Sequence, residues 1–117
     1  PFSIAESQAL ITQGSQDRTV YFIETGSLSV HYEDDAGRVR LAILGAGSAV
    51  GEGGFFSHLP RSATVQAVSA CKLWRLTPMK FAELSNRQPV IALALVMGLG
   101  GLVARRMTDQ RKRIAVT

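Results

Sequence analysis

Short runs of β-branched and aromatic residues, each ended by glycine or acidic turn residues, occupy residues 9–76. Antiparallel strands joined by tight turns give this pattern, whereas helices give longer runs with apolar residues every three or four positions. In Ser27–Glu33, Leu28, Val30 and Tyr32 fall on one face, as a half-buried strand requires. We therefore expect strands at Ala9–Thr12, Thr19–Glu24, Ser27–Glu33, Arg38–Leu44, Ser62–Ala67 and Cys71–Leu76.

After Leu76 the pattern becomes helical. Thr77-Pro78 places a proline at the first position of a short helix that continues through Leu84. Pro89 starts a longer helix, expected to end near Arg113. Along this helix, residues at intervals of three and four positions form one stripe: Ile91, Leu95, Gly98, Leu102 and Arg105.

Strands followed by helices predict a mainly β fold, an antiparallel jelly roll (double-stranded β-helix) with C-terminal helices, and argue against a βαβ protein. A chain of 117 residues suits one domain. We assign residues 1–117 to it, with the β-roll at about 9–76 and the helical arm at about 77–113.

The single cysteine, Cys71, cannot form an intramolecular disulfide, which fits a reducing compartment such as the cytoplasm. The first residues show no basic start or apolar run of a secretory signal. The uncharged apolar stretch at residues 90–104 is shorter than the ~17–25 residues that a membrane-spanning helix needs, so a membrane span is not expected.

The formal net charge of +4 belongs largely to the end of the chain. A cluster of lysine and arginine there would suit nucleic acid, because binding phosphates releases counterions. A solvated helix end, favoured by the helix dipole, explains the same charges, and direct nucleic-acid binding by this domain is not expected. The basic residues are Arg105, Arg106, Arg111, Lys112 and Arg113.

Residues 51–65 interrupt the strand series with glycines, one acid and one arginine. Gly53 and Gly54 lack side chains, so their N–H groups can approach an anion, and a helical turn over Gly53–Phe56 would direct its positive end the same way. Arg61 can donate to two phosphate oxygens, and the Ser62 hydroxyl can add another donor. The segment predicts a phosphate cradle.

Glu52, when ionised, offers only acceptor oxygens, so its natural partner is a hydroxyl pair such as a ribose edge. The alternative for Glu52 and Arg61 is a surface salt bridge over a glycine loop, which would contribute little to stability.

At Gly51-Glu52 and at Pro60-Arg61-Ser62-Ala63-Thr64-Val65 the chain resembles the phosphate-binding cassette of cyclic-nucleotide-binding domains, the regulatory modules of catabolite-activator-type transcription factors, cyclic-nucleotide-dependent kinases and gated channels. The first strands and the Leu44-Gly45-Ala46-Gly47 turn also resemble that family.

The resemblance implies that Glu52 binds the ribose 2′-hydroxyl, that Arg61 binds the cyclic phosphate, and that Ser62 contacts the phosphate or the base. Gly53 replaces the apolar residue common in the family, and because the first expected strand lies close to residue 1, we expect the family's N-terminal helix to be missing or cut away. The expected ligand-binding set is Gly51, Glu52, Gly53, Gly54, Arg61, Ser62 and Ala63.

Other residues that could support different chemistry are expected to be structural. His31 and His58 lie in unrelated segments and assemble neither a metal site nor a catalytic pair, so no enzyme activity and no metal or cofactor is predicted. Cys71 is expected to be a buried, inert thiol. Phe55 and Phe56 could stack on a base, but a core or packing role is expected for them, and Trp74 is expected in the core.

Glycines and alanines in the long helix would let a second helix approach closely, which predicts a homodimer through residues 89–113. The resemblance makes this helix the lid over the base, with Val96, Met97 and Leu99 as positional candidates. We expect a signal-transduction sensor for a cyclic mononucleotide, cyclic AMP favoured over cyclic GMP, that acts on an effector outside these residues. The alternative is a ligand-independent dimerisation module.

Overall fold

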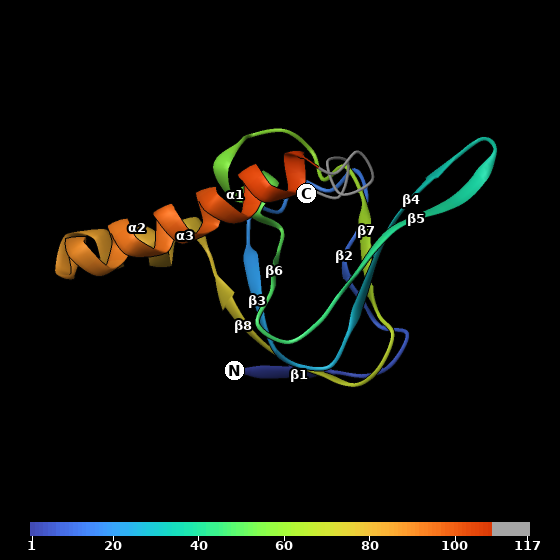
Figure 1. Ribbon diagram of the computed structural model, residues 1–117, viewed down its shortest axis with the longest axis horizontal. Helices are drawn as coiled ribbons and strands as arrows, with labels where there is room; N and C mark the ends of the chain where they lie inside the picture. The colour runs from blue at the N-terminus through green and yellow to red at the C-terminus, as the bar shows by residue number, and fades with distance from the viewer. Residues whose placement is uncertain (109–117) are drawn as a thin grey trace.

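The strands pair into two four-stranded antiparallel sheets that form a roll (Figure 1). The computed structural model describes residues 1–108. One sheet has the order β1-β8-β3-β6 and the other β2-β7-β4-β5. The strands are β1 (Phe2–Ile4), β2 (Ala9–Ile11), β3 (Val20–Thr25), β4 (Leu28–Asp34), β5 (Gly37–Leu44), β6 (Ala49–Val50), β7 (Thr64–Ala67) and β8 (Cys71–Leu76).

The predicted jelly roll is confirmed, and every expected strand is present with its ends shifted by at most about two residues. Two short strands were not expected, because β1 and β6 are too brief to show a periodic pattern. β1 pairs with β8 from Phe2 to Ile4, and β6 pairs with β3 where Tyr21 faces Val50. The second pairing holds the chain immediately before Gly51 against the roll.

The interior of the roll is filled by apolar side chains from both sheets. Leu28, Val30, Val65 and Leu73 have no exposed surface, and Cys71 is buried as expected. Trp74 is 49% exposed, so its predicted core role is wrong. The reason is strand alternation: Leu73 points inward, so its neighbour in β8 points outward.

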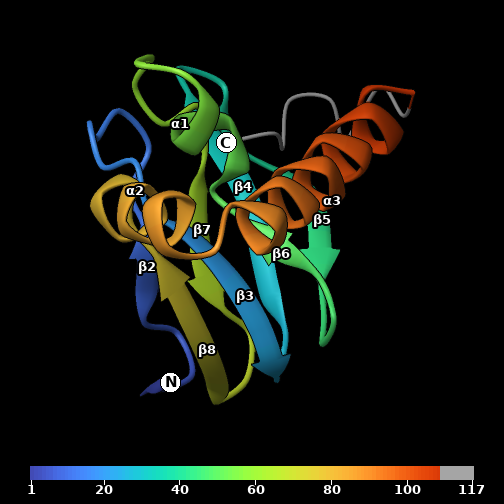
Figure 2. The same cartoon turned by 90° about the vertical axis from the view of Figure 1, so that its left-hand side faces the viewer.

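Three helices follow or interrupt the strands: α1 (Glu52–Phe56), α2 (Pro78–Arg87) and α3 (Pro89–Met107). In Figure 2, α2 and α3 lie across the face of the sheet that contains β8 and β3. The Thr77 hydroxyl accepts from the N–H of Lys80 and caps α2, which extends beyond the predicted end at Leu84. The predicted continuation of α3 to Arg113 lies outside the described residues.

A second apolar cluster joins the helices to the roll. Val20, Ala49, Phe55 and Leu99 are its buried members. The ring of Phe55 meets that of Phe81 edge-on at a centroid distance of 5.5 Å, which confirms its packing role. Phe56 also contacts Phe55 but is 45% exposed. The position of α3 therefore depends on contacts with both α1 and the sheet.

Candidate functional site

The segment predicted to carry the chemistry, residues 51–65, links β6 to β7 and contains α1. We call these residues the cassette. Gly51 precedes α1 with a φ of 91°, a left-handed conformation that favours glycine. The expected turn of helix is present and begins at Glu52. Because the first N–H groups of a helix have no intrahelical acceptor, this end of α1 is suited to an anion.

Arg61, near the end of the cassette, is only 2% exposed. Its Nη1 donates to the carbonyl of Gly51 at 2.7 Å, and its Nη2 donates to the carbonyl of Thr19. The same Nη2 lies 3.1 Å from Oδ2 of Asp17, in an ion pair. These contacts fix the guanidinium between the start of α1 and the segment before β3.

Glycine is required where the backbone passes over this guanidinium. A Cβ on Gly51 would lie 2.6 Å from the Thr19 carbonyl oxygen and 3.0 Å from Nη1 of Arg61. A Cβ on Gly54 would lie 2.6 Å from the same Nη1 and 3.2 Å from the Asp17 carbonyl oxygen. The two glycines therefore let the backbone of residues 51–54 pack directly against the Arg61 guanidinium.

Asp17 is held in its ionised form. Burial alone would raise the pKa of Asp17, but hydrogen bonds from the hydroxyl and N–H of Thr19 and from Arg61 outweigh it and lower the pKa below its ordinary value of 3.8. The Thr19 hydroxyl lies 2.9 Å from Oδ1 of Asp17. At neutral pH the carboxylate is therefore a stable partner for Arg61.

Glu52 is completely buried, and its partner comes from α3. Nη1 of Arg106 donates to Oε1 of Glu52, while Nη2 donates to the Ser48 hydroxyl at 3.0 Å and the Ala49 carbonyl at 2.6 Å. The other carboxylate oxygen, Oε2, has no hydrogen-bond partner among the described residues. Thus the buried carboxylate keeps one acceptor unused.

These contacts rule out one alternative and correct one expectation. The alternative of a surface salt bridge between Glu52 and Arg61 fails, because neither is more than 2% exposed and they form ion pairs with Arg106 and Asp17 respectively. The basic helix end is not entirely solvated, since Arg106 is 4% exposed. Arg111, Lys112 and Arg113 lie outside the described residues.

A cavity of about 330 Å³ lies between the cassette and α3. Gly53, Gly54 and Ser62 line it, together with Val103 of α3. Glu52 and Arg61 lie deeper in the cassette, and Ala63 is fully buried in the roll core. The structure thus gathers the predicted residues into one region but divides them between a cavity wall and a buried layer beneath it.

Sequence reasoning missed Arg106, Asp17 and Arg18. Arg18 donates to the carbonyls of Gly54 at 3.3 Å and Phe55 at 3.2 Å, which clamps α1. The signals were present but weak: Asp17 and Arg18 precede a strand in a polar turn, and Arg106 follows the apolar run of α3. Within residues 1–108 no group of three or more His, Cys, Asp or Glu side chains could hold a metal ion.

The comparisons with known proteins concern this whole region. Residues 1–88 match the family described as cyclic nucleotide-binding domain. The chain is 36% identical over 107 residues to the cAMP-activated global transcriptional regulator CRP of Salmonella typhimurium, a match that covers 90% of this chain and 49% of that protein. The chain therefore spans about half the length of the curated relatives it matches.

Solved structures of cyclic nucleotide-binding domains have the same fold as this chain. A cyclic nucleotide-binding domain from Methylobacillus flagellatus superposes with a TM-score of 0.88 at 24% identity, over 96% of this chain and 64% of that one, and supports the fold. The regulatory domain of Toxoplasma gondii PKA, crystallised with cAMP, gives a TM-score of 0.66 at 33% identity, over 70% of this chain and 31% of that one.

Proposed function

Because the chain belongs to the family of cyclic nucleotide-binding domains, we propose that it binds a cyclic mononucleotide in the cassette and passes the binding event through α3 to an attached effector. Cyclic AMP is the favoured ligand, ahead of cyclic GMP, since the matched Salmonella regulator is named as cAMP-activated and the Toxoplasma domain was crystallised with cAMP. The proposed effector lies outside these residues, in keeping with relatives about twice as long as this chain.

One observation carries the proposal: a fully buried carboxylate, Glu52, has one oxygen tied to Arg106 and the other without a described partner. An unpaired oxygen on a buried carboxylate is costly, which is why such groups are usually found with a donor. A ribose 2′-hydroxyl supplies a neutral donor of the right kind. Binding then stabilises a group that the ligand-free domain leaves half satisfied.

The phosphate is assigned to Arg61, the first-turn N–H groups of α1 and Ser62. Gly54 packs directly against the buried Arg61 guanidinium, so in this proposal the phosphate replaces one of the carbonyl contacts that Arg61 makes with Gly51 and Thr19. Charge-assisted hydrogen bonds from a guanidinium to phosphate are short and strong. We propose that the ligand leaves unchanged and that the domain is not an enzyme, because His31 and His58 lie in unrelated segments and form no pair with a nucleophile in the cassette.

Arg106 links the site to α3. It holds Glu52 with one nitrogen and the backbone of β6 with the other, so α3 can move away only if the Glu52 contact is broken or exchanged. A ligand that engages Glu52 alters the balance between positions of α3, and that difference in free energy is what an effector receives.

The outer face of α3 is proposed to meet a second copy of the chain in the cytoplasm. Val90 is 79% exposed, Leu93 63% and Met97 69%, and a cavity of about 680 Å³ lies along Gly100, Gly101 and Ala104. By length and composition alone α3, at 19 residues, could also cross a membrane, since its most apolar 18 residues have a mean hydropathy of 1.7 and only 17% of them are buried. Small residues beside apolar ones suit a close helix pair.

The exposed face also favours the alternative, a ligand-independent dimerisation module. Calorimetric titration with cyclic AMP, cyclic GMP and 5′-AMP separates the two. The proposed function predicts saturable binding of a cyclic nucleotide and at least about tenfold weaker binding of 5′-AMP, whose dianionic phosphate is not closed onto the ribose. Arg61→Lys should weaken the cyclic nucleotide, because a single ammonium replaces a planar two-pronged donor. Absence of binding to either cyclic nucleotide, with dimer formation intact, would favour the alternative.

A further inference from the structure

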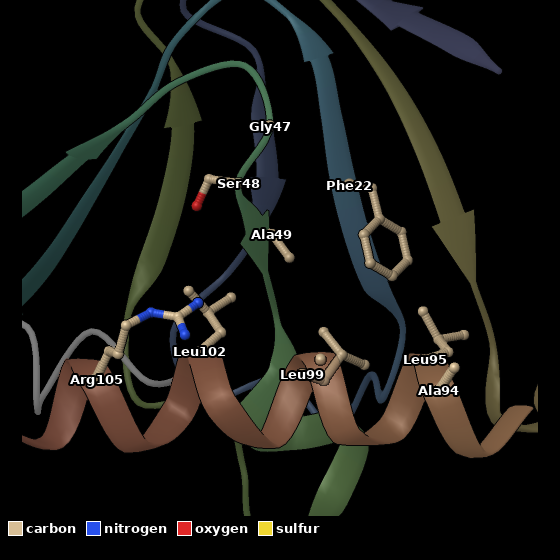
Figure 3. A pocket seen from close by; sticks show the side chains of 10 residues that line it. Phe22, Gly47, Ser48, Ala49, Ala94, Leu95, Leu99, Leu102 and Arg105 are labelled. Carbon is tan, nitrogen blue, oxygen red and sulfur yellow. The ribbon is translucent and has the colours of Figure 1, made fainter.

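A second cleft lies between the inner face of α3 and the sheet, apart from the cassette (Figure 3). It has a volume of about 270 Å³ and an apolar end formed by Phe22, Leu95 and Leu99. Figure 3 shows these leucines rising from α3 toward β6, with the Phe22 ring above Leu95. A cavity of about 230 Å³ adjoins it and shares Ser48, Leu102 and Arg105.

The junction of the two cavities carries a positive charge. Arg105 lines both and is exposed, and its guanidinium forms no hydrogen bond or ion pair within residues 1–108. Neither cavity is lined by an aspartate or glutamate, and the nearby Arg106 is already paired with Glu52. An open apolar cleft bordered by the exposed Arg105 therefore matches a molecule with an apolar body and a terminal anion.

We propose that this cleft binds a small carboxylate with an aliphatic or aromatic tail, with the tail between Phe22 and Leu99 and the carboxylate at Arg105. Ligand pockets that are mostly apolar with a few convergent polar groups have this division of roles.

The cleft is connected to the cassette through Ser48. The Ser48 hydroxyl accepts from Arg106, the residue that holds Glu52, and Ser48 also lines both cavities. A molecule between α3 and β6 must act on the position of α3 and on this hydrogen bond. The carboxylate would therefore alter the affinity for cyclic nucleotide, a consequence that rests on the proposed function.

The test begins without nucleotide. Octanoate, butyrate and 1-octanol are titrated into the full chain by calorimetry. The proposal predicts saturable binding of octanoate, much weaker binding of butyrate, which lacks the tail, and about tenfold loss of octanoate affinity in Arg105→Gln with no change for 1-octanol. Octanoate binding that is absent, or unaffected by Arg105→Gln, would overturn the proposal.

A filling variant supplies a second, structural test. A Cβ on Gly98, which lines the cleft, would meet nothing within 4 Å, so Gly98→Leu can project into the open space without a backbone clash. It should abolish octanoate binding. Gly100→Leu is the control for octanoate binding alone, because Gly100 also has open space but lines the outer cavity of the proposed helix pair, and it should bind octanoate normally even if dimer formation is weakened. Equal octanoate binding by both variants would refute the site. A second copy of the chain could instead cover the cleft. In that case the unmodified protein would be a dimer that binds no octanoate, and Gly98→Leu would dissociate it, which would also refute the site.

The coupling is tested last, by measuring the affinity for cyclic AMP with and without saturating octanoate. A severalfold change is expected, with the same factor in the reverse experiment. Octanoate that binds but leaves an observed cyclic AMP affinity unchanged would overturn the coupling. If the domain binds no cyclic nucleotide, the proposed function fails, whereas the octanoate titrations still decide the cleft.

Discussion

Replacing Arg106 with leucine tests the buried pair on which the α3 connection depends. The Glu52 side chain has no exposed surface and that of Arg106 only 5%. Arg106→Leu would leave a buried carboxylate with neither oxygen partnered among the described residues. Removing one member of a buried ion pair typically costs about 3–5 kcal/mol, because the remaining charge is uncompensated.

The measurement is urea unfolding followed by circular dichroism. With an m-value of about 1.5 kcal/mol/M, that loss lowers the unfolding midpoint by about 2–3 M. Since whole domains are stable by only about 5–15 kcal/mol, Arg106→Lys is a milder companion that keeps the charge but loses the forked contacts to Ser48 and Ala49, at about 1–2 kcal/mol.

The double variant Glu52→Gln/Arg106→Leu removes both charges and should be more stable than Arg106→Leu alone, because a buried amide costs less than a buried carboxylate. This order of stabilities is specific to a buried pair. A change below about 0.5 kcal/mol for Arg106→Leu, the range of ordinary surface substitutions, would refute the reasoning.

Three further outcomes follow from the same geometry. Gly54→Ala should destabilise the domain, because the new Cβ would lie 2.6 Å from Nη1 of Arg61. Gly100→Ala, whose Cβ would meet nothing within 4 Å, should instead gain about 0.5–1 kcal/mol of stability from helix propensity. Equal effects of the two variants in thermal melts would argue against the close approach of Gly54 to Arg61. Burial, with Arg38 and Arg40 nearby and Glu33 opposing them, lowers the pKa of His31 below its ordinary value of 6.5. The folded state therefore favours the neutral ring, and stability should be full above pH 6.5 and decline as pH falls; unfolding titrations of His31→Gln should lose that part of the slope, and an unchanged slope would contradict it. Asp17 has a lowered pKa, so its contribution is present above pH 3.8 and lost as pH falls through the folded value; Asp17→Asn should reduce the acid sensitivity, and unfolding curves identical to those of the parent would count against the ion pair with Arg61.

The strands could be predicted from the sequence because their apolar residues alternate and their turns are marked by glycine or acidic residues. β6 was not predicted because it contains only Ala49 and Val50, and a segment of two residues shows no periodicity. Trp74 was placed in the core by its size, although the alternation of β8 sets it on the outside. A residue's face in a strand therefore decided its burial more than its side chain did.

In the candidate site, too, some residues could be predicted from the sequence and others could not. Glu52 and Arg61 were identified because they stand in a local glycine-rich segment, where neighbouring residues show what chemistry is possible. Arg106 was missed because its role depends on a contact across more than fifty positions of chain, made only when α3 packs on β6. Charge and helix position predicted solvation, whereas tertiary packing placed the guanidinium beside a buried carboxylate.

The proposed role of Glu52 is tested most directly by comparing cyclic AMP with 2′-deoxy-cyclic AMP in calorimetric titrations of the unmodified chain. If Oε2 accepts from the ribose hydroxyl, the deoxy compound should bind about ten- to a hundredfold more weakly, the usual value of a hydrogen bond to a charged group. In Glu52→Gln that preference should shrink to a few fold. Equal affinity of the unmodified chain for the two nucleotides would contradict the assignment of Glu52 and, with it, the central claim.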